Sequence, residues 1–428
     1  MLIIFATILI MTTPTGSLSP NQCLIYLGIF RIILGIGVGG DYPMSASVTS
    51  DRSNLRKRGT MLAYIFSNQG WGSLMGSVVT IIVLACYKHV MDVEGKTSKV
   101  DGVWRIVIGV SLIPAFGTLY QRLTLPESNR FIASQKLKNA TSAAEEATSP
   151  STSGESNVEK ETEKDSKHLT DSPTSTVADD EPSQDNEKEK ENGRSHFRDF
   201  VIYFSEWRHA KILIGTCVCW FLLDVTFYGI NLNQNVILQQ IRYDGKMGTA
   251  WHHMFKISTG NIIITTLGFV PGYWVSVLTI EIMGCKWIQI QGFLLAALFL
   301  AVLAEKFTTL STAGFIVCFA FLQFFFNWGA NTYYLIRDVT PPKALFPTRY
   351  RATAHGLSAA FGKLGAIVSA LAFNMLTKKI GTPAVLWIFF GCCIAGAGFT
   401  LLLPEVKGRD PDLVLAEEMR EAREQLPG

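Results

Sequence analysis

The amino-acid sequence predicts an all-α membrane protein that crosses the bilayer many times. The chain has 428 residues, of which 48% are hydrophobic and 17% are charged. Nine long stretches contain almost no charged side chain, whereas residues 141–200 contain almost no aliphatic one. An apolar helix of about 20 residues crosses the ~30 Å hydrocarbon layer of a bilayer. A large soluble protein with nine buried helices fits such long uncharged stretches poorly.

The predicted spans follow one another along the chain, and most reach the length that a bilayer requires. A shorter apolar segment, Met1–Met11, precedes them and lacks the basic start of a signal peptide. We expect this segment to be the end of a tenth helix whose beginning is absent. The nine full spans are residues 22–50, 59–86, 103–121, 212–237, 260–280, 288–304, 310–336, 352–376 and 383–404.

A long polar segment separates the fourth and fifth of these ten spans. Residues 141–200 contain 16 acidic and seven basic side chains. A segment with so much charge and so little apolar area cannot bury enough surface to fold. We therefore predict a disordered acidic linker at residues 126–206 and a short soluble tail at residues 406–428.

The basic loops set the expected orientation in the membrane. The connection at residues 51–59 carries four basic side chains, and the connection around residues 337–351 is also basic. Short loops rich in Lys and Arg face the cytoplasm. Because the number of spans between them is even, the linker and the tail are expected on the same cytoplasmic side.

Two parts of the chain resemble each other, which predicts two halves at residues 1–125 and 207–405. KRGTMLAYIFSNQGWGSLMG (57–76) resembles YRATAHGLSAAFGKLGAIVS (350–369), and LTLPES (123–128) resembles LLLPEV (401–406). Parallel repeats with a central site at their interface are typical of secondary transporters.

Ionisable side chains inside predicted spans are costly and usually functional. Asp41 ends a glycine-rich run, and Lys363 lies in a span that contains no acid. Trp220, Asp224 and Tyr228 are four residues apart, so they share one face of a helix. If Asp224 and Lys363 serve structure alone, the expected form is an ion pair across the two halves.

Uncharged polar residues in the spans have two interpretations each. Gln69 and Asn331 could bind a ligand or could be hydrogen-bonding contacts between helices. Trp220 and Tyr228 could line a site or could belong to an aromatic belt at the membrane surface. The eight cysteines lie mostly in apolar runs without metal-ligand spacing, so we predict no metal site and no cofactor.

Several motifs resemble the fungal phosphate:proton symporters of the major facilitator superfamily. The motifs occur in the family's order over nearly the whole chain outside the linker. They are GIGVGGDYPMSASVTSD (35–51), NQGWG (68–72), LTLPESNR (123–130), WFLLDVTFYGINLNQNVIL (220–238) and FPTRYRATAHGLSAAFGKLGA (346–366).

This resemblance implies a twelve-helix fold, of which ten helices are expected here because the family's first two spans have no counterpart. It also implies a phosphate site midway across the membrane, with carboxylates that take part in proton movement. The implied phosphate residues are Tyr42, Gln69, Trp220, Tyr228, Asn331 and Lys363, and the implied proton-coupling residues are Asp41 and Asp224.

The chain departs from the family pattern at three further places. Cys285 stands where arginine is usual, and Asn129 stands where proline is common. The segment RDVTPPKAL (337–345) is longer than its family counterpart and lacks a glutamate. We expect a truncated form of the family's chain.

The expected function is uptake of inorganic phosphate with protons across the plasma membrane by alternating access. The expected partners are phosphate, protons and the lipid bilayer, without nucleic acid, and no enzyme activity is expected. One alternative is a transporter of a glycerophosphodiester or another organic anion. A second alternative is a phosphate sensor that does not transport.

Overall fold

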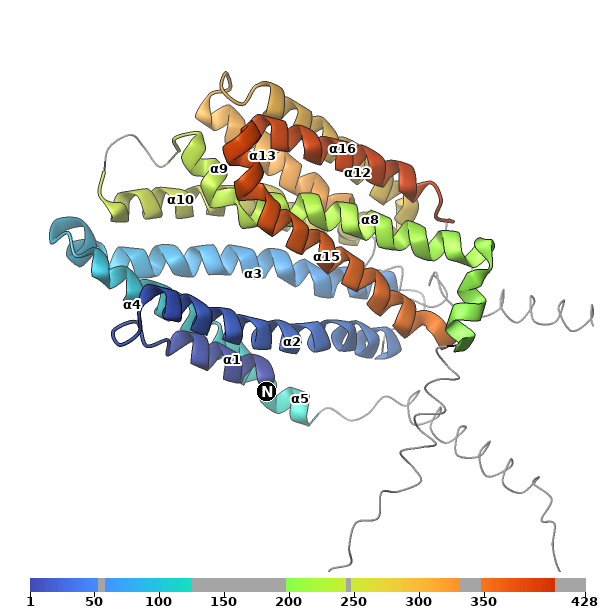
Figure 1. The fold of residues 1–428 in the computed structure, drawn as a ribbon, viewed down its shortest axis with the longest axis horizontal. Helices are drawn as coiled ribbons and strands as arrows, with labels where there is room; N and C mark the ends of the chain where they lie inside the picture. The colour runs from blue at the N-terminus through green and yellow to red at the C-terminus, as the bar shows by residue number, and fades with distance from the viewer. Residues whose placement is uncertain (53–57, 125–197, 244–247, 331–347, 405–428) are drawn as a thin grey trace, which may run out of the picture. The chain divides into compact units, whose positions relative to one another are not determined.

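The computed structural model describes residues 1–52, 58–124, 198–243, 248–330 and 348–404, and these form helices and connections without a strand. One compact unit comprises Met1–Leu125 and Glu206–Gly428, and a second comprises Pro126–Ser205. The predicted all-α class is confirmed. The α-helices of the first unit (Figure 1) are α1 (Leu2–Met11), α2 (Pro20–Arg52), α3 (Arg58–Cys86), α4 (Val100–Val110), α5 (Leu112–Leu123), α8 (Trp207–Leu232), α9 (Gln234–Gln240), α10 (Ala250–Ile264), α11 (Val270–Met283), α12 (Cys285–Glu305), α13 (Thr312–Phe325), α15 (Thr348–Ile380) and α16 (Thr382–Thr400).

Nine helical segments of the described chain are long and apolar enough to cross a membrane, and each overlaps one of the nine predicted spans. Helix α1 has 10 residues, which gives a length of about 15 Å, half of the hydrocarbon layer. Three spans are composite. One runs through α4 and α5, and a second joins α10 to α11 through the π-helical turn Thr265–Phe269. A third continues from α13 into the π-helical turn Phe326–Ala330.

Local sequence fixes several helix ends. Thr249 accepts a hydrogen bond from the backbone N–H of His252 and so caps α10, and Ser311 caps α13 in the same way through Gly314. Gly284, at φ 81°, is the single residue between α11 and α12. A positive φ favours glycine, which lets the chain reverse there within one residue.

The core of the first unit lies among the helices that follow residue 206. Figure 1 shows α15 crossing α8, and α12 and α16 also lie side by side. Their buried side chains form one apolar cluster, to which α3 adds Leu62, Ala63 and Phe66. A smaller cluster joins Leu84 of α3 and Val103 of α4 to Trp251 of α10. Helix α3 therefore packs on both the early and the late helices.

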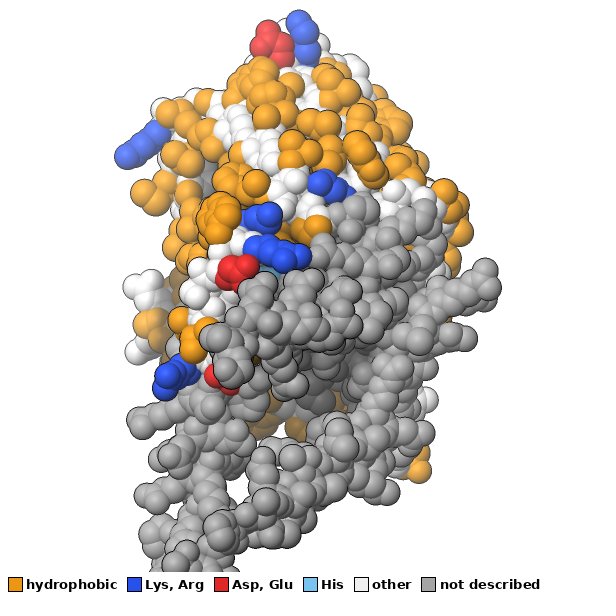
Figure 2. All heavy atoms as spheres, turned by 90° about the vertical axis from the view of Figure 1, so that its right-hand side faces the viewer, with side chains coloured by type: hydrophobic (Ala, Val, Ile, Leu, Met, Phe, Trp, Pro, Cys, Tyr) orange, Lys and Arg blue, Asp and Glu red, His pale blue; other side chains and the backbone are white. Residues whose placement is uncertain are grey.

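Much of the outer surface is apolar. Leu24, Ile113, Leu278 and Leu371 are each exposed by 67% or more. Figure 2 shows apolar side chains over most of the described surface on one face, with few charged groups among them. Such a surface is costly in water but matches lipid chains, as the membrane prediction requires.

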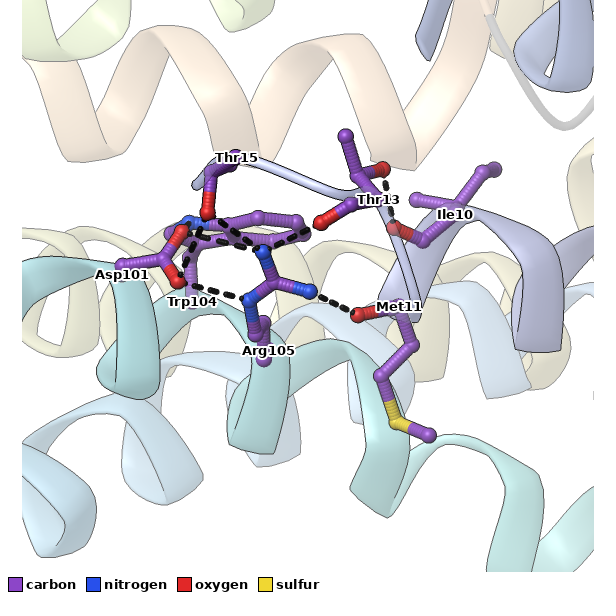
Figure 3. Close-up of polar contacts among 7 residues, drawn as sticks. All are labelled: Ile10, Met11, Thr13, Thr15, Asp101, Trp104 and Arg105. Atoms are coloured by element: carbon purple, nitrogen blue, oxygen red, sulfur yellow. Dashed lines mark hydrogen bonds and ion pairs between the residues drawn. The ribbon is translucent and has the colours of Figure 1, made fainter. Parts of the chain in front are cut away.

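Arg105 of α4 forms hydrogen bonds with the chain at the end of α1 (Figure 3). Arg105 pairs with Asp101 at 2.8 Å and donates to the backbone oxygens of Met11 and Thr13 at the end of α1. Trp104 donates to the same carboxylate at 3.0 Å. The guanidinium thereby gives a donor to the Met11 carbonyl, which belongs to the group that a helix end leaves without an intrahelical partner.

Several expectations fall outside the described residues. They concern most of the linker at 126–206, the tail at 406–428, Asn129, the segment 337–345 and most of the two basic loops. The bounds of the two halves, 1–125 and 207–405, stay a prediction, as does the orientation of the linker and the tail.

Candidate functional site

Helix α8 presents three of the predicted site residues on one face. It is continuous from Trp207 to Leu232, so the four-residue spacing of Trp220, Asp224 and Tyr228 places them on successive turns. Trp220 and Asp224 are buried, with 4% and 2% of their surfaces exposed, whereas Tyr228 is half-buried. This face packs against α15.

Lys363 on α15 binds two of the three. Its Nζ lies 3.2 Å from the Asp224 Oδ2 atom and donates to the Tyr228 hydroxyl at 3.0 Å. The same ammonium lies 4.6 Å from the centre of the Tyr228 ring. The Lys363 side chain is 57% exposed and that of Asp224 only 4%. The pair therefore has an accessible cation and a buried carboxylate.

The ion pair was expected across the two halves, and that expectation is wrong. Both α8 and α15 lie within residues 207–405, so the pair forms inside one predicted half. The reason is the close crossing of the two helices. A Cβ atom added at Gly365 would lie 2.4 Å from the backbone oxygen of Phe221, so glycine allows this approach.

Trp220 is held between the same two helices. A Cβ atom at Gly362 would lie 2.4 Å from the Trp220 ring, and the His355 ring centroid is 5.6 Å from that of Trp220. The indole thus packs beside the residue that precedes Lys363. This buried packing argues against an aromatic belt position for Trp220.

Gln69 reaches the site region from α3. Its Oε1 accepts a hydrogen bond of 3.1 Å from the hydroxyl of Tyr273 on α11. Gln69 and Tyr228 both line a cavity of about 780 Å³. The contact with Tyr273 shows that Gln69 does join helices, which was one of its two interpretations, and the cavity leaves its other face available to a ligand.

The described lining of the cavity carries no charged side chain and combines apolar with polar groups. Asn231, Gln234 and Asn261 contribute amides, and α3 contributes hydroxyls from Ser73, Ser77 and Thr80. The amides are linked, since Gln234 donates to Asn261 at 2.8 Å. Tyr228, one of the lining residues, contacts Lys363 of the Asp224–Lys363 pair.

Three predicted site residues are not seen in the group around Lys363. Asp41 is half-buried on α2, which packs against α1 and α3. Asn331 and the side chain of Tyr42 lie outside the described residues. The structure therefore brings together Trp220, Asp224, Tyr228 and Lys363, and it connects Gln69 to Tyr228 through a shared cavity.

Sequence reasoning missed Tyr273 and the amides of the cavity. Tyr273 lies in the run VPGYWVSV, where a single tyrosine among apolar residues gives little signal. Asn231 and Gln234 lie in GINLNQN, and four amides within five residues of a predicted span were a usable signal.

The arrangement can bind an oxyanion. An ammonium, a phenol and amide N–H groups donate hydrogen bonds, and phosphate accepts them. The buried carboxylate can accept from a hydroxyl of monobasic phosphate, or it can take a proton. Over the described residues, no group of His, Cys, Asp and Glu side chains is placed to hold a metal ion.

Comparison with known proteins agrees with this chemistry. A protein-family profile described as "Sugar (and other) transporter" matches residues 1–414. A Schizosaccharomyces pombe protein provisionally named an inorganic phosphate transporter is 43% identical over 423 residues, which cover 96% of this chain and 72% of that protein. The inorganic phosphate transporter PHO84 of Saccharomyces cerevisiae is 35% identical over 427 residues, covering 95% and 70%.

Solved structures show the same fold. The proton:xylose symporter XylE of the major facilitator superfamily, from E. coli, superposes with a TM-score of 0.61 at 17% identity. The match covers 97% of this chain and 82% of XylE. The expected superfamily fold and the resemblance to fungal phosphate transporters are confirmed. This chain therefore belongs to the sugar (and other) transporter family and has the fold of the major facilitator superfamily.

Proposed function

We propose that this chain carries inorganic phosphate and protons together across the plasma membrane by alternating access. The observation that carries the proposal is the contact of Lys363 with both Asp224 and Tyr228, at 3.2 Å and 3.0 Å. The names of the fungal relatives support phosphate as the substrate.

Charge balance explains why the two substrates would move together. Asp224 and Lys363 neutralise each other when the site is empty. A bound phosphate monoanion would leave a net charge of −1 inside the membrane, where net charge is costly. A proton on Asp224 restores neutrality and releases Lys363 to the anion. Phosphate and proton thereby favour each other's binding.

The other proposed residues complete this site. Gln69 and Tyr228 offer donors to the phosphate from opposite helices, and Trp220 closes the wall beside Lys363. Tyr42 and Asn331 would add further donors and acceptors, and Asp41 would be a second proton carrier. The linker and the tail are proposed to face the cytoplasm.

The cavity volume favours a second candidate substrate. A cavity of about 780 Å³ has room for a glycerophosphodiester as well as for phosphate. A phosphodiester has one ionisable oxygen where inorganic phosphate has three, and its single negative charge would use the same cation. A sensor that binds phosphate without moving it would use the same contacts.

Uptake of radiolabelled phosphate by yeast that lack their own phosphate transporters tests the proposal. We expect the chain to restore uptake, faster at acidic than at neutral external pH. Asp224→Asn should reduce uptake at least tenfold. Thr226→Val is the matched control, because its hydroxyl bonds to the Leu222 backbone oxygen of its own helix.

Three results would count against the proposal. Inhibition of uptake by an unlabelled glycerophosphodiester at lower concentration than by phosphate would favour the second substrate. Phosphate binding without uptake would favour the sensor. Full uptake by Asp224→Asn would remove that carboxylate from the mechanism.

A further inference from the structure

Tyr273 makes a hydrogen bond whose acceptor belongs to the proposed phosphate site. Its hydroxyl donates to Gln69 Oε1 at 3.1 Å, although 204 residues separate the two in the chain. Tyr273 is 1% exposed and is among the largest fully buried side chains of the described chain. It also belongs to the apolar cluster against which Tyr228 packs.

The packing of α3 on α11 fixes the position of the Tyr273 ring. A Cβ atom at Gly70, the residue after Gln69, would lie 3.1 Å from the Tyr273 Cδ2 atom and 3.5 Å from the Val270 Cα atom. A second contact lies nearby, where the Tyr64 ring meets the Trp274 ring at 5.8 Å and 80°. The tyrosine therefore has little freedom to turn its hydroxyl away from Gln69.

In this hydrogen bond the oxygen of the Gln69 amide is the atom on the Tyr273 side. A carboxamide has an oxygen that accepts and an NH₂ group that donates. Because Tyr273 occupies the oxygen, the NH₂ group is the end left for a ligand in the cavity that Gln69 and Tyr228 both line. An oxyanion requires donors and is repelled by an amide oxygen.

We propose that Tyr273 is a positioning residue for anion binding, because its hydroxyl fixes the Gln69 amide with the NH₂ group toward the substrate. This inference rests on the proposed phosphate site and adds a residue on a different helix from any of the predicted ones. Tyr273 does not itself touch the substrate. It acts on binding through the orientation of the Gln69 amide. The test must therefore separate a change in that orientation from a change in the packing of α3 on α11.

The test is a double-substitution cycle that measures the KM and maximal rate of phosphate uptake for Tyr273→Phe, Gln69→Ala and the two together. Tyr273→Phe keeps the ring and removes the donor. We expect KM to rise about 3- to 10-fold, as loss of one neutral hydrogen bond predicts. The maximal rate should change less than about twofold, because the substitution weakens the binding of phosphate and leaves the transport step that follows binding unchanged.

In the Gln69→Ala background, Tyr273→Phe should leave KM unchanged, because the amide that it positions is gone. Tyr64→Phe is the matched control, since it removes a hydroxyl from the same helix contact and keeps the Tyr64–Trp274 ring contact. It should leave KM and the maximal rate at the wild-type values. The thermal unfolding temperature of each purified variant, without phosphate, shows that it is folded.

The proposal is overturned if Tyr273→Phe leaves KM unchanged in the wild-type background. It is also overturned if the substitution raises KM equally with and without Gln69, or if Tyr64→Phe has the same effect. Failure of the proposed function looks different, because the wild-type chain would then show no phosphate uptake. In that case the same four chains are compared by thermal unfolding of the purified proteins. The phosphate concentration needed to raise the unfolding temperature then takes the place of KM. If phosphate does not stabilise the wild-type chain either, both proposals are refuted.

Discussion

At the scale of single residues, Gly362 leaves the space that the Trp220 ring occupies. The added Cβ atom would lie 2.4 Å from Cδ1 and 2.7 Å from Nε1 of the indole, which is closer than atoms in contact can approach. The Trp220 indole therefore packs against α15 at Gly362, directly before Lys363. A single methyl group at this position would therefore disturb both the packing and the cation beside it.

We predict that Gly362→Ala lowers phosphate uptake and destabilises the protein by about 1–3 kcal/mol, as overpacking does in a close-packed core. Gly391→Ala on α16 is the control, because a Cβ atom there meets nothing within 4 Å. It should be neutral or slightly stabilising, since alanine favours a helix over glycine. Thermal unfolding and uptake assays check both variants. Equal stability of the two would contradict the placement of Trp220.

The separate helices were largely predictable from the sequence, whereas their contacts were not. Long uncharged runs predicted the spans because length and apolarity alone decide whether a helix can cross a bilayer. The shared face of Trp220, Asp224 and Tyr228 followed from helix geometry. The partner of Lys363 depends on which helices cross, and the sequence does not state that. This is why the ion pair was expected across the halves, and why the bond from Tyr273 to Gln69 was missed.

Arg105 shows how one side chain can attach a short helix to the bundle. Its guanidinium reaches the backbone oxygens of Met11 and Thr13 and also pairs with Asp101. A planar guanidinium directs several donors in fixed directions, which an ammonium does not. Helix α1 has 10 residues, and these hydrogen bonds at its end add to its packing against α2 and α4.

We predict that Arg105→Lys lowers the free energy of unfolding by about 1–3 kcal/mol, because at least one carbonyl group loses its donor. Lys99→Gln, an exposed cation a few residues earlier, should change it by less than about 0.5 kcal/mol. Thermal unfolding of the purified variants in detergent measures the difference. A lysine variant as stable as the wild-type chain would show that α1 is held by its apolar contacts alone.

At the scale of the whole molecule, the described part of the chain combines a largely apolar surface with an ion pair whose carboxylate is buried. The buried carboxylate of Asp224 is neutralised by Lys363, which donates to Tyr228 on the lining of the cavity. The proposed transport cycle keeps this region neutral by accepting an anion and a proton together. Alternating access would then expose this neutral site first to one side of the membrane and afterwards to the other.

Proton movement that depends on phosphate tests this central claim most directly. The purified chain is placed in lipid vesicles that contain a pH-sensitive dye, and phosphate is added outside at a pH where the monoanion predominates. The account predicts that phosphate entry acidifies the vesicle interior, that sulfate does not, and that Asp224→Asn abolishes the acidification. Phosphate entry at the wild-type rate without any proton movement would contradict the account.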